Sequence, residues 1–124
     1  MTRKLCKHAG PAEQRQAYAI FRRTCLDLIK RLGLQDWDIT VRNAVLDAGN
    51  DDAAAVTELV SDSKIAVITM NKGYTPKNAA QVARHEIGHI VLANIQRLAS
   101  ERWGSESELD LEVERLCTLL EKVL

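Results

Sequence analysis

Two histidines and a glutamate stand in one short segment that could hold a metal ion and use it. The segment reads His85-Glu86-Ile87-Gly88-His89. On a helix, residues four apart lie on the same face with their Cβ atoms about 6 Å apart, so two imidazoles can bind one ion. Glu86 projects about 100° round the helix from His85, beside the ion, where a carboxylate can accept a proton from water. The spacing predicts a helical metal site with a general base.

The residue types favour zinc and hydrolysis. Neutral imidazole suits zinc, zinc lowers the pKa of its bound water towards neutrality, and a carboxylate can take the proton as that water attacks a carbonyl. The pattern H-E-x-x-H arises by chance in well under about one per cent of chains of this length. We therefore expect one Zn²⁺ per chain, with His85 and His89 as ligands and Glu86 as the catalytic base.

A catalytic zinc usually has a third protein ligand and one open position. The candidates are the carboxylates of the last helical segment: Glu106, Glu108, Asp110, Glu112 and Glu114. If this helix returns antiparallel after a turn at Gly104, it draws level with His89 only after a similar rise, which favours Glu112 over Glu106. Glu112 also lies nearer the apolar stripe of its helix than its acidic neighbours. We predict Glu112 as the third ligand, with Glu108 as the alternative.

The remaining histidine and the cysteines give weaker signals. His8 lies with Cys6 in a basic segment without pattern, and a place for either at the metal is a lesser alternative. The three cysteines are an odd number and form no C-x-x-C pair, which argues against a disulfide framework or a cysteine zinc site. Cys25 and Cys117 fall in apolar helical patterns, so we expect buried thiols.

The order of the elements predicts an α+β fold. Apolar residues at three- and four-residue steps predict helices, and alternating or compact β-branched runs predict strands. The expected elements are a helix over about Pro11–Leu32, strands near Trp37–Val41, Ala53–Val60 and Lys64–Met70, a helix over about Lys77–Arg102, and a last helix from about Ser105. The 124 residues suffice for one core, so we predict a single domain over residues 1–124 with a small three-stranded sheet.

The helix that carries the metal motif shows two apolar faces. Ile87, Val91, Ile95 and Leu98 form the stripe expected to cover the sheet, and His85, Gly88, His89, Leu92 and Gln96 form the stripe expected to face the last helix. A glycine costs a helix interior roughly 1 kcal/mol relative to alanine. Gly88 either allows close approach of a strand or substrate, or is merely tolerated.

Composition narrows the function classes. Lys plus Arg and Asp plus Glu are 17 each, so a net charge of zero gives no general attraction to nucleic acid or anionic lipid. No run approaches the roughly 18 apolar residues of a membrane span, and the N-terminal segment lacks the apolar stretch of a signal peptide. We expect a cytoplasmic protein that is not associated with a membrane.

The motif, with a glutamate from a following helix, resembles that of the gluzincin zinc metallopeptidases. The order of elements in so short a chain is most similar to the minimal single-domain minigluzincins, and more distantly to ImmA/IrrE-type and SprT-type domains. The resemblance implies a zincin-like fold, zinc bound by His85, His89 and a glutamate, and a peptide or protein substrate hydrolysed by a zinc-bound water with Glu86 as general base. In this group the strand before the motif helix lies at the sheet edge and pairs with substrate. Lys64–Met70 would take that role, unless it is an ordinary core strand.

Several alternatives remain open at this stage. No tyrosine or histidine follows the motif to stabilise an oxyanion, which leaves Tyr74 or Arg84 as candidates. A zincin-fold binding or regulatory protein with latent or little catalytic activity is an alternative to a peptidase. A third reading is DNA binding by the first helix, through Arg15, Arg22, Arg23, Lys30 and Arg31.

Overall fold

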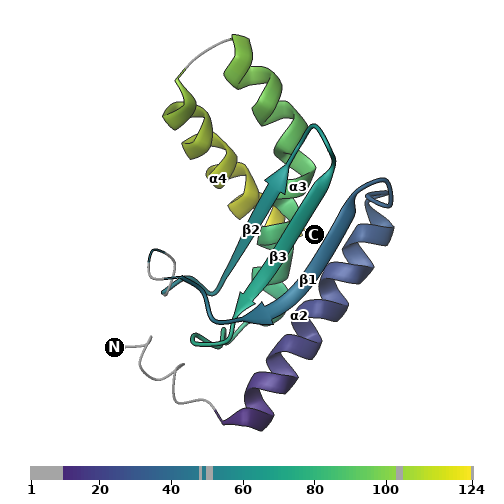
Figure 1. Ribbon diagram of the computed structural model, residues 1–124, viewed down its shortest axis with the longest axis vertical. Coiled ribbons are helices and arrows are strands. Elements are labelled where there is room, and N and C mark those ends of the chain that lie inside the picture. Colours follow the sequence, from purple (N-terminus) through teal and green to yellow (C-terminus); the bar gives the residue numbers. More distant parts are fainter. Residues whose placement is uncertain (1–9, 48, 50–51, 103–104, 124) are drawn as a thin grey trace.

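The computed structural model describes residues 10–47, 49, 52–102 and 105–123. Its elements are α2 (Pro11–Arg31), β1 (Asp38–Ala44), β2 (Ala55–Val60), β3 (Ile65–Asn71), α3 (Ala79–Arg102) and α4 (Glu106–Val123) (Figure 1). The α+β class and the order of elements agree with the sequence prediction. His8 and Cys6 lie outside the described residues. None of the helices described has the length and apolar character needed to cross a membrane.

The strand order of the sheet is β1-β3-β2, with β3 in the centre. β3 is parallel to β1 and antiparallel to β2, and its Ile68 lies opposite Val41 on one side and Thr57 on the other. Of the two alternatives for this strand, the core strand is correct and the edge strand is wrong. The reason is its continuous β-branched run, which suits a strand that is paired along both edges and largely buried.

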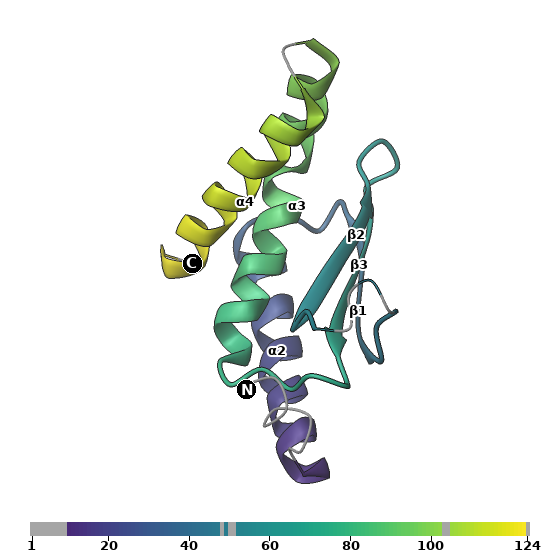
Figure 2. The ribbon, with the colours of Figure 1, turned by 90° about the vertical axis from the view of Figure 1, so that its left-hand side faces the viewer.

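One face of the sheet is covered by α2 and α3, and α4 packs on the far side of α3 (Figure 2). The core between the sheet and the two helices consists of Phe21, Cys25 and Leu28 from α2, Ala66, Ile68 and Met70 from β3, and Ala79, Ala83, Ile87 and Ile90 from α3. On the other side of α3, Val113 and Cys117 of α4 are buried. The motif helix is therefore packed on two sides, as the two apolar faces predicted.

The face of α3 that covers the sheet differs from the predicted stripe. Ile87 is fully buried, but Val91 is 38% exposed and Ile95 is 63% exposed. Ile90 and alanines of α3 take their place in the core. The stripe fails because the buried face of α3 runs through Ile87, Ile90 and Ala93, so Val91 and Ile95 lie to one side of it.

Gly88 of α3 lies directly against Cys117 of α4. A Cβ atom at this position would lie 3.3 Å from the Sγ atom of Cys117 and 3.5 Å from its Cα atom. The glycine thus allows close approach of a helix, whereas the sequence offered a strand or substrate, or a glycine that is merely tolerated. The two helices meet nearly backbone to backbone at the level of the metal motif.

We expect Gly88→Leu to lower the free energy of unfolding by about 1–3 kcal/mol, because a side chain larger than Cβ must push α4 away. Leucine favours helices more than glycine does, so a loss must come from the contact with α4. Urea unfolding would measure it, with Val91→Leu at an exposed position of the same helix as the control. Equal stability of Gly88→Leu and the wild type would contradict this close packing.

Candidate metal centre

The two histidines of the motif lie together on α3, with their ring centroids 5.1 Å apart. Both side chains are about one-fifth exposed, at 21% for His85 and 22% for His89. Burial lowers the pKa of His89, although the carboxylate of Glu114 acts in the opposite direction. A lowered pKa favours the neutral imidazole, which is the form that binds metals.

Glu114 of α4 completes the group. Its Oε2 atom lies 3.4 Å from Nε2 of His85, and its Oε1 atom lies 3.0 Å from Nε2 of His89. One potential ligand atom from each of the three residues lies within 4.8 Å of the others. In a tetrahedral zinc site with bonds of about 2.0–2.1 Å, neighbouring ligand atoms are about 3.3 Å apart. This His-His-Glu group could therefore hold a metal ion.

The sequence prediction placed Glu112 or Glu108 in this position, and the structure places neither there. Glu112 is exposed and accepts a hydrogen bond of 3.1 Å from Nε of Arg115. That hydrogen bond, together with the charge of Arg115, lowers the pKa of Glu112. Glu108 is also exposed, in the first turn of α4, where its backbone N–H donates to Oγ of Ser105. Glu114 is the acidic residue that the fold brings to the two histidines.

The rotation of α4 about its own axis explains this correction. Among the α4 side chains whose burial the structure describes, Val113 and Cys117 are buried, while Leu109, Leu116 and Leu120 are only half-buried. The helix is thus turned towards Cys117, which fits against Gly88, and away from the centre of the leucine stripe. At about 100° per residue, this turn moves Glu114 towards α3 and Glu112 away from it. The pairing of Gly88 with a small residue in the last helix was the signal that sequence reasoning missed.

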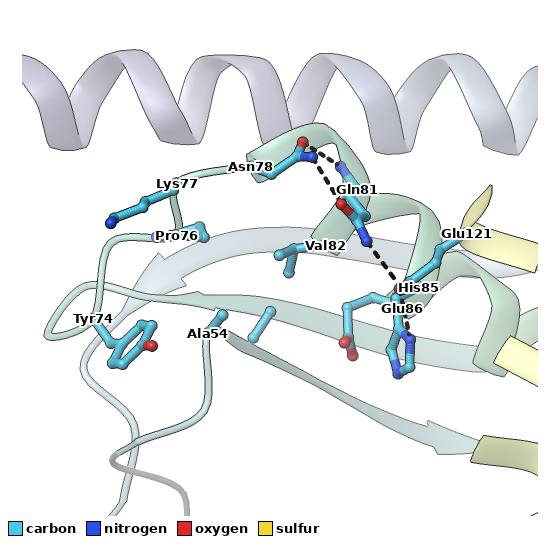
Figure 3. A pocket seen from close by; sticks show the side chains of 11 residues that line it. Ala54, Tyr74, Pro76, Lys77, Asn78, Gln81, Val82, His85, Glu86 and Glu121 are labelled. Carbon is cyan, nitrogen blue, oxygen red and sulfur yellow. Dashed lines mark hydrogen bonds and ion pairs between the residues drawn. The ribbon is translucent and has the colours of Figure 1, made fainter. Parts of the chain in front are cut away.

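Glu121 orients His85 and was not predicted from the sequence. Its Oε2 atom lies 3.0 Å from Nδ1 of His85, and its Oε1 atom accepts a hydrogen bond of 3.1 Å from Nε2 of Gln81 (Figure 3). A carboxylate on Nδ1 fixes the ring so that Nε2 faces Glu114, as partners of metal-binding histidines commonly do. The sequence did contain a signal for this contact, because Glu114 and Glu121 are two helical turns apart and share one face of α4.

A capping residue extends this network to the start of α3. Oδ1 of Asn78 accepts a hydrogen bond of 3.1 Å from the backbone N–H of Gln81, as an N-cap residue does. The side-chain amide of Asn78 in turn donates to Oε1 of Gln81 at 2.8 Å. Asn78, Gln81, Glu121 and His85 therefore form one chain of hydrogen bonds from the start of α3 to the imidazole ring of His85 (Figure 3).

Glu86 lies beside the His-His-Glu group and not within it. Its side chain is buried, and Oε1 accepts a hydrogen bond of 2.7 Å from the hydroxyl of Thr57 in β2. Burial raises the pKa of Glu86 to about 7, although the hydrogen bond from Thr57 and the charge of His85 act to lower it. A carboxyl group with a pKa near neutrality is well suited to accept a proton and return it.

A cavity of about 470 Å³ opens next to His85 and Glu86 (Figure 3). Its other lining residues come from the start of β2, the loop before α3 and the first turns of α3: Ala54, Ala55, Tyr74, Pro76, Lys77, Asn78, Gln81 and Val82, with Glu121 of α4. Figure 3 shows Tyr74 at the opposite end of the cavity from His85 and Glu86. The cavity could accept a substrate side chain beside the metal group.

The two residues suggested for oxyanion stabilisation therefore lie away from the centre of the site. Tyr74 lines the far end of the cavity, and Arg84 is engaged elsewhere. Nε of Arg84 donates a hydrogen bond of 2.7 Å to the backbone carbonyl of Glu121, near the C-terminus of α4. This contact makes Arg84 an anchor between α3 and α4, which is a structural role.

Fold and site together define an α+β protein with a His-His-Glu group that could hold a metal ion. Comparisons with protein-family models, with curated proteins and with solved structures each found no match. The function must therefore be inferred from the chemistry of the site itself.

Proposed function

We propose that this protein is a zinc-dependent metallopeptidase with a zincin-like fold, related to the gluzincins and most closely to the minigluzincins. In this proposal His85, His89 and Glu114 hold one zinc ion. The observation that carries it is a His-His-Glu group on two packed helices with the buried carboxyl group of Glu86 beside it. Two imidazoles and one carboxylate are a usual donor set for catalytic zinc. When bound, zinc would supply a Lewis acid that activates water and polarises a carbonyl.

The surrounding residues of the chain each have a task in this proposal. Glu86 accepts a proton from the attacking water and returns it to the leaving amine of the peptide. Thr57 holds the carboxyl group of Glu86 in a fixed orientation through its hydroxyl group. Glu121 holds His85 so that its Nε2 atom faces the other ligands. Burial on two sides of α3 keeps these groups in place.

The edge strand β2 is the best candidate to bind an extended peptide. It lies at one edge of the described sheet, and Thr57 of this strand contacts Glu86 directly. A peptide that pairs with the free edge of β2 by strand addition would pass the metal group. The role that the sequence resemblance gave to the strand at residues 64–70 therefore moves to its neighbour. The start of β2 also lines the cavity at the site, which could hold a substrate side chain.

We expect Val82→Trp to fill this cavity and to lower kcat/KM at least about tenfold for peptides with a large apolar residue beside the scissile bond. Val82 lines the cavity one helical turn before His85, so an indole would occupy the space without replacing a ligand. Peptides with glycine at that position should be affected less. An unchanged zinc content would show that the metal site is intact. Ile95→Trp, at an exposed position of α3, is the control. The same loss for both peptides would argue against a side-chain pocket.

Zinc content and chelator-reversible cleavage test the proposed function. Purified protein should contain about one zinc ion per chain and should cleave members of a pool of unstructured peptides. A chelator should abolish cleavage, and added zinc should restore it. If no zinc is bound and added zinc does not raise the melting temperature, the metal site is wrong. Bound zinc with no cleavage across the pool would instead support the binding or regulatory alternative.

A further inference from the structure

Another cavity, with mostly polar lining residues, lies between α2 and α3 and has a volume of about 350 Å³. It is lined by Arg23, Thr24, Asp27, Leu28 and Arg31 of α2 and by Arg84 of α3. None of these residues lines the cavity at the metal group. Three arginines against one aspartate give this cavity a formal charge of 3 − 1 = +2. Such a concentration of guanidinium groups is notable in a chain with a net charge of zero.

The three guanidinium groups are only partly used within the protein. Arg84 is held in position by its Nε–H, which donates to the Glu121 carbonyl at 2.7 Å. Arg31 lies 3.5 Å from the carboxylate of Asp27, with both side chains about 60% exposed. An exposed pair of this kind contributes only a few tenths of a kcal/mol, so Arg31 can turn to another anion at little cost. Arg23 has no ion-pair partner among the residues that the structure describes.

We propose that this cavity binds a phosphate group through Arg23, Arg31 and Arg84. A guanidinium group presents several N–H donors in a planar fork that matches the oxygens of phosphate. A phosphate group with nearly two negative charges would balance the formal charge of +2. The carboxylate of Glu121 contacts His85, and Arg84 is bonded to the neutral backbone carbonyl of Glu121. The phosphate could be free in solution or carried on a phosphorylated side chain.

The placement of these arginines separates this proposal from binding of DNA. The basic residues of α2 that the sequence singled out include Arg15, Arg22 and Lys30, which do not line the cavity. A nucleic acid would contact the whole basic side of α2, whereas a single phosphate group needs only the cavity. Arg84 lies on a different helix, so the site depends on the fold and not on the composition of one helix. The proposal is independent of the proposed peptidase function.

An NMR titration of the purified protein, without added zinc, with inorganic phosphate tests the site. Chloride at equal ionic strength is the reference. We expect saturable shifts confined to the Nε–H groups of Arg23, Arg31 and Arg84 and the neighbouring backbone. Arg23→Gln, a change at the surface that leaves the core intact, should weaken phosphate binding about tenfold. Arg15→Gln on the same helix is the matched control and should not change the affinity.

A phosphoserine peptide and its unphosphorylated counterpart distinguish the two sources of phosphate. Tighter binding of the phosphopeptide than of inorganic phosphate supports a site for phosphorylated chains, and the reverse order supports a site for the free anion. The proposal is overturned if chloride produces the same shifts, or if Arg15→Gln weakens binding as much as Arg23→Gln does. It is also overturned if a DNA duplex binds more tightly than both phosphate probes and loses affinity equally in the two variants.

Discussion

Glu114→Gln is expected to weaken zinc binding by about a hundredfold or more, whereas Glu112→Gln should leave it unchanged. The carboxylate of Glu114 lies 3.0 Å from Nε2 of His89 and 3.4 Å from Nε2 of His85, so the substitution replaces a charged candidate ligand by a neutral amide. Glu112 is exposed and paired with Arg115, away from this group. Competition with a chromophoric chelator would measure both affinities.

The two variants form a matched pair. The same substitution is made two residues apart on one helix, and it preserves the volume of the side chain in both cases. Circular dichroism and urea unfolding should show that both proteins fold. If Glu112→Gln lost zinc while Glu114→Gln retained it, the orientation of α4 that brings Glu114 to the histidines would be wrong. The sequence prediction of Glu112 would then be right.

The two histidines of the site could be predicted from the sequence, whereas the choice between Glu112 and Glu114 could not. The geometry of His85 and His89 follows from one helix, because residues four apart share a face in any α-helix. The third ligand depends on how α4 is rotated against α3. Glu112 and Glu114 are about 200° apart around α4, so they lie on either side of its buried face. The predicted rotation of the helix therefore decides which of the two carboxylates faces α3. That rotation is set by the contact between Gly88 and Cys117, which is a tertiary contact.

The three-stranded sheet shows the same difference between local patterns and tertiary pairing. Local patterns predicted all three strands, since alternation and β-branching are properties of neighbouring residues. The strand order is a matter of which strands pair, and it places β3 between the other two. The hydrogen bond between Thr57 and Glu86 joins residues 29 positions apart and follows from that order. For this reason the sequence could single out Glu86 as the candidate general base, but not Thr57, which holds its carboxyl group.

Glu86→Gln is expected to slow peptide hydrolysis by about 10²–10⁴-fold while zinc affinity stays unchanged. Glutamine has nearly the same shape, and its amide oxygen can still accept the hydrogen bond from Thr57, but it cannot take up a proton. The residues of the His-His-Glu group are untouched, so the variant should bind one zinc ion as the wild type does. Single-turnover cleavage of the best wild-type substrate, at equal zinc occupancy, is the measurement.

The stability of the metal-free protein gives this variant a second readout. Burial raises the pKa of Glu86 from 4.5 to about 7, so between these values the folded state binds more protons than the unfolded state. The free energy of unfolding of the wild type therefore falls as the pH rises through this window, and Glu86→Gln avoids the loss. Above pH 7 the variant should be more stable than the wild type by on the order of 3 kcal/mol, with little pH-dependent advantage below pH 4.5. Urea unfolding at pH 4.5 and pH 8 would measure this. Loss of cleavage with zinc retained and higher stability at pH 8 would assign Glu86 to proton transfer, whereas loss of zinc or of stability would make it a ligand or a structural residue.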